Sequence, residues 1–265
     1  MSEDVVLLAV DDRGVATITL NRPTVNNAYN GDVIAGMTAC VGQAAADPKV
    51  RVLVLRANGR HFQAGADLKW LKEIGQLSAA ENVDVSRNTY NAVQGLTTVM
   101  KPTVALVQGG CFGGGTGILA ACDVVIASED AIFAITEARW GVMAGIIVPH
   151  LNAAIGPRNL RRYGLTCERF GADKALEMGL VHQVCPTGDL DEAAAPVIDQ
   201  LLLSAPEALA QTKYRTLADA GLLIDDAAGE ALVVEHSLKR QSNEAIEGLN
   251  SFAEKRDPSW YPGAA

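Results

Sequence analysis

The sequence has few cysteines and no surplus of basic residues. Its five cysteines are scattered without a CxxC pair, which gives no support to a disulfide framework or a metal site and suits the reduced thiols of a cytoplasmic protein. Lys and Arg number 22 against 31 Asp and Glu, which gives a net charge of −9. No basic stripe offsets that charge, so we expect no nucleic-acid partner. A small anionic ligand remains possible where backbone amides or local basic residues meet it.

Long uncharged segments are also scarce. Only residues 102–122 form an uncharged run long enough to span a bilayer, and this run begins at Pro102 and contains Gln108 and six glycines. The N-terminus is acidic and lacks the basic segment of a signal peptide. We therefore expect a soluble chain with no membrane partner and, at 265 residues, one sizeable core.

The order of short apolar segments predicts an α/β protein. Residues 5–10 and 15–20 predict a β-hairpin, and 32–47 predict a helix with Val33, Met37 and Val41 on one face. Further strands are expected at 50–56, 103–107, 124–128, 131–135 and 180–185, with helices at 66–74, 81–100, up to 122, 146–155, 157–165 and 172–179. Only helices are expected after 190, so we divide the chain into a core (1–190) and a helical C-terminal region (191–265).

The stretch "CFGGGTGILAACD", residues 111–123, places three consecutive glycines between a strand and a helical turn. Glycine is costly inside regular structure, so the triplet suggests that something must approach the backbone closely. A Walker phosphate loop is excluded because no Lys-Ser or Lys-Thr follows. "GTGILA" (115–120) satisfies the dinucleotide-binding pattern, with Glu137 about 20 residues on, and keeps an NAD-linked oxidoreductase open. The other alternative is an oxyanion hole at a helix N-terminus, with a second donor from the loop 61–68.

Five blocks in order resemble the crotonase superfamily, the enoyl-CoA hydratases and isomerases, over nearly the whole chain. They are "NRPTVNNA", "FQAGADLK", "KPTVALVQGGCFGGGTGILAACD", "FAITEARWG" and "SFAEKRDPSW". The resemblance implies a spiral of ββα turns with a helical C-terminal trimerisation region, assembled as a homotrimer or a hexamer. It implies an acyl-CoA substrate and no separate cofactor, since coenzyme A is part of the substrate.

The resemblance also implies the residues of the site. Glu137 would be the acid–base residue, and the N–H groups of Ala64 and Gly114 would hold the thioester oxygen. Contacts to the substrate or to coenzyme A are implied at Val25, Ala66, Asp67, Leu68, Gly113, Gly117, Gly145, Phe252 and Lys255. His150 is a weaker candidate for the acyl pocket, and Arg139 could pair with a carboxylate at the far end of a substrate.

The sequence departs from the two-glutamate hydratases at Gly117, where those enzymes have their first glutamate. The chain is most similar to single-glutamate bacterial hydratases of the 3-methylglutaconyl-CoA and isohexenylglutaconyl-CoA type. A hydratase is therefore expected, with Gly117 leaving room for a branched or carboxylated acyl group. A Δ3,Δ2-enoyl-CoA isomerase, which needs only one glutamate, and a non-catalytic acyl-CoA binder stay open as alternatives.

Overall fold

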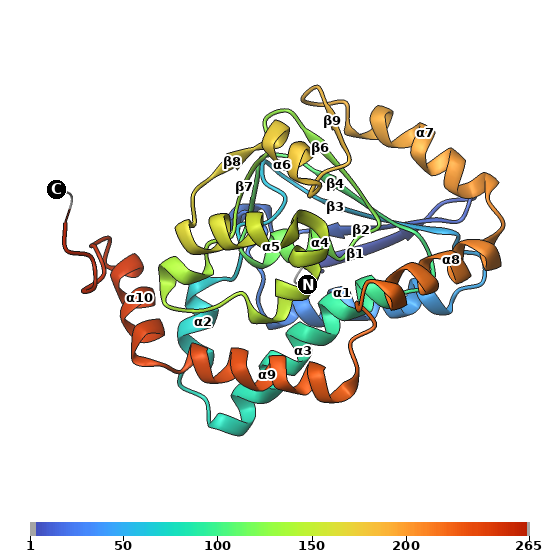
Figure 1. The fold of residues 1–265 in the computed structure, drawn as a ribbon. Coiled ribbons are helices and arrows are strands. Elements are labelled where there is room, and N and C mark those ends of the chain that lie inside the picture. The colour runs from blue at the N-terminus through green and yellow to red at the C-terminus, as the bar shows by residue number, and fades with distance from the viewer. Residues whose placement is uncertain (1–3, 264–265) are drawn as a thin grey trace.

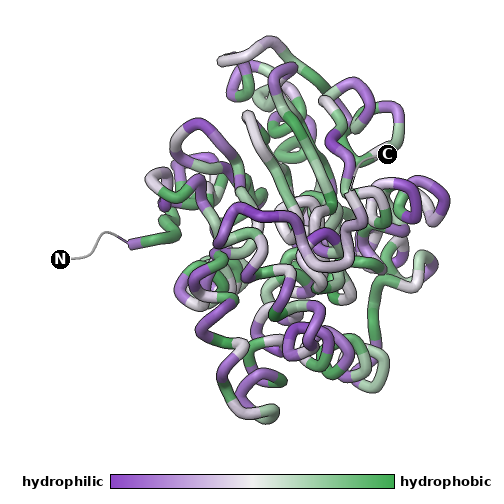
Figure 2. Tube along the Cα trace, turned by 90° about the vertical axis from the view of Figure 1, so that its left-hand side faces the viewer, coloured by the Kyte–Doolittle hydropathy of each residue, from purple (hydrophilic) through white to green (hydrophobic). Residues whose placement is uncertain are grey.

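A six-stranded sheet forms the centre of the computed structural model, which describes residues 4–263 (Figure 1). Its strands lie in the order β1-β2-β3-β4-β6-β9, and β1 is antiparallel to β2 while all other neighbours are parallel. The bounds are β1 Val6–Val10, β2 Val15–Leu20, β3 Val52–Ala57, β4 Thr103–Val107, β6 Val124–Ser128 and β9 Gln183–Cys185. The inner strands β3 and β4 are mostly apolar and buried, apart from the half-buried Arg56 of β3, as is typical of parallel strands covered on both faces. Figure 2 shows hydrophobic segments in the interior of the molecule.

A second, three-stranded sheet places the glycine-rich loop. It consists of β5 (Gly110–Phe112), β7 (Ile132–Ala134) and β8 (Phe170–Gly171). Strands β5 and β7 are parallel, with Phe112 opposite Ala134. Both strands therefore end at the same edge of the sheet, and the loop after β5 lies beside the segment after β7 that carries Glu137. Strand β5 was not predicted, because three residues next to a glycine run give no periodic signal.

Helices cover the sheet on both sides. The helices up to residue 178 are α1 Gly31–Ala46, α2 Leu68–Ile74, α3 Ala79–Thr98, α4 Gly114–Ala120, α5 Val148–Thr166 and α6 Ala172–Met178. Helix α3 begins with a capping box between Ser78 and Glu81. Helix α5 is interrupted at Gly156, which has a φ of 72° and precedes Pro157. The prediction of two helices that meet at this point is confirmed as a kink.

Within residues 190–263 the structure has four helices: α7 Leu190–Leu203, α8 Pro206–Asp219, α9 Asp226–Arg240 and α10 Asn243–Ala253. Helix α7 packs against the sheet through Leu190 and Ala194, in one apolar cluster with Val52 and Val104. Helix α9 packs along α3, and α10 extends to the C-terminal side of the molecule (Figure 1). The all-helical C-terminal region is therefore confirmed, and part of it closes the core.

Three short 3₁₀ helices complete the fold: η1 Pro23–Val25, η2 Glu137–Trp140 and η3 Gly145–Ile147. Within residues 4–263, no helix has both the length and the apolar character that crossing a bilayer requires. All five cysteines are buried free thiols.

Candidate active site

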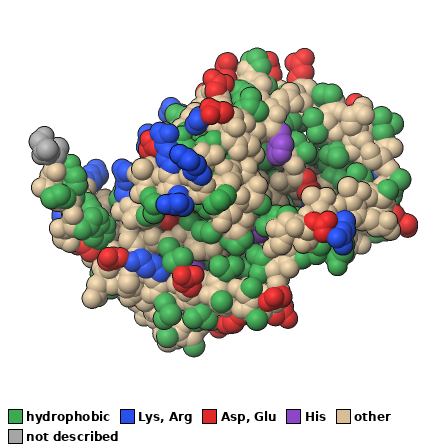
Figure 3. Space-filling view, viewed as in Figure 1, with side chains coloured by type: hydrophobic (Ala, Val, Ile, Leu, Met, Phe, Trp, Pro, Cys, Tyr) green, Lys and Arg blue, Asp and Glu red, His purple; other side chains and the backbone are tan. Residues whose placement is uncertain are grey.

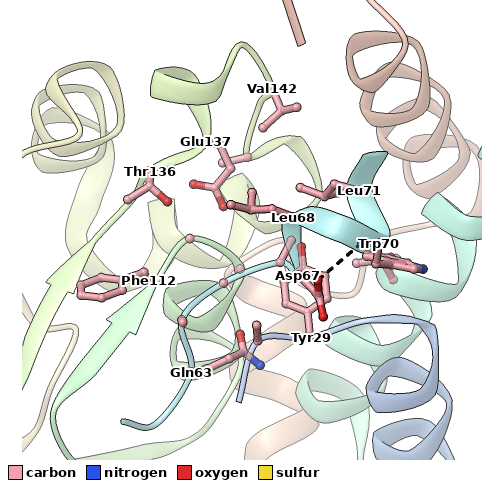
Figure 4. A pocket seen from close by; sticks show the side chains of 18 of the residues that line it. Tyr29, Gln63, Asp67, Leu68, Trp70, Leu71, Phe112, Thr136, Glu137 and Val142 are labelled. Atoms are coloured by element: carbon pink, nitrogen blue, oxygen red, sulfur yellow. Dashed lines mark hydrogen bonds between the residues drawn. The ribbon is translucent and has the colours of Figure 1, made fainter. Parts of the chain in front are cut away.

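A cavity of about 510 Å³ lies at the shared edge of β5 and β7 (Figure 4). Helices α1, α2, α3 and α9 enclose it, and most of the lining side chains are apolar. Nine of the predicted site residues line this cavity: Val25, Ala64, Ala66, Asp67, Leu68, Gly113, Gly114, Glu137 and Phe252. Segments from five parts of the sequence thus meet in one place.

The Glu137 carboxyl group lies directly against the glycine loop. A Cβ atom placed on Gly113 would lie 3.1 Å from Glu137 Oε1 and 3.2 Å from the hydroxyl of Thr136. Gly113 has a φ of 52° and forms the N-cap of α4, a conformation that side chains rarely adopt. The glycine is therefore required both for the turn and for the approach of the carboxyl group.

Glu137 is poised to exchange protons near neutral pH. Burial raises the pKa of Glu137 from 4.5 to about 7, although the N–H groups of Glu137 and Thr136 partly offset this effect. Its Oε2 atom is buried and has no hydrogen-bond partner among the described residues. A carboxyl group with a raised pKa and a free oxygen in a cavity is suited to general acid–base work.

Two residues that line the cavity with Glu137, Gly114 and Ala66, have backbone N–H groups without a hydrogen-bond partner among the described residues. Gly114 is the first residue of α4, where an N–H has no partner within the helix and the helix dipole favours negative charge. Ala66 lies opposite Tyr29 in an isolated bridge, whose two hydrogen bonds are made by the residues on either side of Ala66. The Tyr29 N–H donates to the carbonyl oxygen of Gly65, and the Asp67 N–H donates to the carbonyl oxygen of Tyr29. The N–H of Ala66 itself donates no hydrogen bond within residues 4–263.

The predicted donor Ala64 differs from this pair. Its N–H donates to the carbonyl oxygen of Asn26 at 3.0 Å, so it is already used inside the protein. Ala64 lines the cavity, but the structure does not leave its amide available to a ligand. Within this loop it is therefore Ala66, and not Ala64, whose N–H stays free, because the bridge to Tyr29 uses only the groups of its neighbours.

Gly117 does not open space for a ligand. A Cβ atom on Gly117 would lie 2.1 Å from Cγ2 and 2.4 Å from Cβ of Ile147, so the place of a side chain at 117 is filled by Ile147. Gly117 is buried and does not line the cavity, whereas Ile147 does. The expectation that this glycine makes room for the acyl group is wrong, since the isoleucine occupies that room.

Four other predicted candidates lie outside the cavity lining: Gly145, Lys255, His150 and Arg139. Gly145 lies between two lining residues, Ala144 and Ile146, and Lys255 follows α10 on the surface. Roles for these two stay predictions. His150 is buried against Thr97, and burial lowers its pKa to about 4. Arg139 is exposed and donates to the carbonyl of Thr166, so it does not face the cavity.

The dinucleotide-binding pattern is not supported by its position. Residues 115–120 all lie inside α4, a helix of seven residues, and not in the turn that precedes it. In that fingerprint the first glycine forms the turn between strand and helix. The backbone therefore lacks the geometry that the NAD-linked alternative requires.

Several lining residues were not predicted. Tyr29 stands beside Gly114, and a Cβ there would meet its ring at 2.8 Å. Gln63 is fully buried, and neither atom of its amide group has a partner. His236 and Arg240 reach the cavity from α9, about a hundred residues after Glu137. The signal for Arg240 was its register, since Gly229, Val233, Ser237 and Arg240 form the buried face of α9.

Helix α2 forms part of the cavity wall, and this wall includes basic residues. Asp67 caps α2 by accepting from the N–H of Lys69 and Trp70, and it pairs with Arg22 at 3.1 Å (Figure 4). Lys69 and Arg169 are two basic residues that line the cavity. Figure 3 shows Lys and Arg side chains gathered over the region of α5, on a molecule that is acidic overall. This local positive charge suits a polyanionic ligand.

Comparison with known proteins places these features in context. A family model described as enoyl-CoA hydratase/isomerase matches residues 11–262. A Thermus thermophilus protein that bears an enoyl-CoA hydratase name is 32% identical over 252 residues, which cover 95% of this chain and 99% of that protein.

Solved structures show the same similarity. An enoyl-CoA hydratase from Shewanella pealeana is 35% identical with a TM-score of 0.79, and the match covers 97% of this chain and 96% of that one. One from Mycobacterium avium is 32% identical with a TM-score of 0.86, over 98% and 100% of the two chains. The expected α/β fold with its helical C-terminal region is confirmed.

Proposed function

The chain belongs to the enoyl-CoA hydratase/isomerase family, and we propose that it is a hydratase, which adds water across the α,β double bond of an acyl-CoA thioester. The observation that carries this proposal is the free, buried oxygen of Glu137 beside the N-terminus of α4. The hydratase names of its relatives favour hydration over isomerisation.

In the proposed reaction, the thioester oxygen accepts hydrogen bonds from the N–H groups of Gly114 and Ala66. The Glu137 carboxylate removes a proton from a water molecule while the oxygen of that water forms a bond to Cβ. The electron pair of the double bond moves toward the thioester and produces an enolate oxygen, which the two N–H groups stabilise. Protonated Glu137 then gives its proton to Cα, so that one carboxyl group serves as base and acid.

The alternative that shares this site is a Δ3,Δ2-enoyl-CoA isomerase, in which Glu137 moves one proton between two carbons and no water is added. The mass of the product separates the two activities. With a 2-enoyl-CoA such as crotonyl-CoA, a hydratase yields a product heavier by one water. A 3-enoyl-CoA turned over with no change in mass, together with no hydration of any 2-enoyl-CoA, would refute the hydratase proposal.

We also propose a branched or glutaconyl-type acyl group and an assembly of trimers, alone or as a hexamer. The substrate proposal draws no support from Gly117, for the reason given above. Support for assembly comes from apolar side chains that the single chain leaves exposed in its C-terminal helices, including Leu203 (80% exposed), Leu238 (64%) and Ile246 (55%). Light scattering coupled to gel filtration measures the assembly, and a monomer would refute it.

A further inference from the structure

A buried arginine without a carboxylate partner lies in the wall of the cavity. Arg240, the last residue of α9, is only 3% exposed. Its hydrogen bonds to Asn82 and Ser86 of α3 all come from one nitrogen, Nη2. Nε is buried without a partner, and within residues 4–263 no salt bridge includes Arg240.

The groups around Arg240 leave its charge uncompensated. His236 bonds to Ser86 through Nδ1, and burial, together with the charge of Arg240, lowers the pKa of His236 to about 3, so the imidazole is neutral at neutral pH. Burial and the negative charge of Glu137 raise the pKa of Tyr29, which therefore stays a neutral phenol. Burial lowers the pKa of Arg240 to about 10, which still leaves the guanidinium charged at neutral pH.

A buried charge without a counter-ion is strongly unfavourable, and proteins usually place a carboxylate beside it. Here the protein supplies a hydroxyl and a carbonyl group that hold one nitrogen of the guanidinium, Nη2. The same residue lines the cavity that contains Glu137. The fork of an arginine matches the two oxygens of a carboxylate, so the counter-ion that fits best is a carboxylate brought by the ligand.

We propose that Arg240 is a specificity-determining residue that binds a second carboxylate at the far end of the acyl group, so that the preferred substrates are enoyl-CoA thioesters of dicarboxylic acids. This inference rests on the proposed acyl-CoA activity and names its substrate class. Ser86 and Asn82 act as positioning residues that hold the guanidinium.

The test uses saturated CoA thioesters, which cannot be hydrated, so that binding is measured apart from turnover. Succinyl-, glutaryl- and adipyl-CoA are compared by calorimetry with butyryl-, pentanoyl- and hexanoyl-CoA. The coenzyme A part is the same in each pair, and the three lengths locate Arg240 along the acyl chain. At one length or more we expect the dicarboxylic thioester to bind at least about tenfold more tightly, as charge-assisted hydrogen bonds to a buried arginine predict.

Two variants test whether the preference for dicarboxylic thioesters depends on Arg240. Arg240→Met should remove the preference, since methionine keeps an unbranched apolar stem without the charge. The matched control is Arg87→Met, which removes an arginine that pairs with Glu230 between the same helices, α3 and α9, outside the cavity lining. The control should keep the full preference.

Two results would overturn the proposal: no preference at any length in the unmodified protein, or a preference that survives Arg240→Met. The first is decisive even if the variant does not fold. Failure of the hydratase proposal is seen separately, as absence of hydration from a protein that still prefers dicarboxylic thioesters.

Discussion

Replacement of Glu137 by glutamine removes a carboxyl group whose ionisation the fold opposes. Since the pKa of Glu137 is raised from 4.5 to about 7, the folded protein binds its proton more tightly than the unfolded chain does. Below about pH 4.5 the Glu137 carboxyl group is protonated in both the folded and the unfolded state. The tighter binding of the proton by the folded protein then contributes fully to the free energy of unfolding. As the pH rises through 7 the contribution is lost, because the folded state must then hold a desolvated carboxylate.

The size of the effect follows from the shift. About 2.5 pKa units at 1.36 kcal/mol each give at most about 3 kcal/mol between the acidic and alkaline limits. Between about pH 5.5 and about pH 8.5, a range that stays above the isoelectric point near 4.9, roughly 2 kcal/mol of this difference develops. Glu137→Gln should therefore gain about 2 kcal/mol in free energy of unfolding relative to wild type across that range.

Urea denaturation of both proteins at several pH values measures this gain. Glu235→Gln, which removes an exposed carboxylate from α9, controls for the change in net charge. In activity assays, Glu137→Gln should lose about 10²–10⁴ in turnover and keep its binding of acyl-CoA. The wild-type rate should fall as the pH drops below about 7, because Glu137 then becomes protonated. Parallel stability curves for wild type and Glu137→Gln would refute the buried-base assignment, and so would a variant with near-normal turnover.

Three further predictions, each with its own control substitution, test the geometry. Gly114→Pro should lower kcat by about 10²–10³ because it deletes the proposed oxyanion donor at a helix position that tolerates proline. Gly114→Ala adds the same contact with Tyr29 but keeps the N–H, so equal losses would exclude the donor role. Gly117→Glu should lower the melting temperature by overpacking against Ile147, and Ile147→Ala should restore it in the double variant, so additive effects would contradict the contact. Asp67→Ala should cost about 1–2 kcal/mol in urea unfolding through loss of the α2 cap, whereas Asp67→Asn should cost less, and an unchanged alanine variant would show that the cap is not needed.

The elements with strong periodicity could be predicted from the sequence. The apolar runs of β3 and β4 and the buried face of α1 gave their type and place, since burial on one or both faces leaves a repeating pattern. The loops of the site could be predicted through the resemblance, because short blocks such as "FQAGADLK" keep their spacing.

Relations between distant segments could not be predicted. The free amide at Ala66 depends on a bridge to Tyr29, and the filling of the Gly117 position depends on Ile147, thirty residues later. The register of Arg240 on α9 is a signal for burial, but the cavity that it lines forms only when α9 packs on α3. These features follow from tertiary contacts, for which a single sequence carries no direct record.

Helix α9 closes the cavity from a part of the chain that contributes nothing to the edge formed by β5 and β7. Substitutions at the positions of α9 that line the cavity can alter this part of the wall while Glu137 and the N-terminus of α4 keep their places. Under the proposed function, the residues that select the acyl group and the residues that carry out the reaction thus lie in separate parts of the chain. The same division offers engineers a defined segment, residues 226–240, to randomise when a different acyl group is wanted.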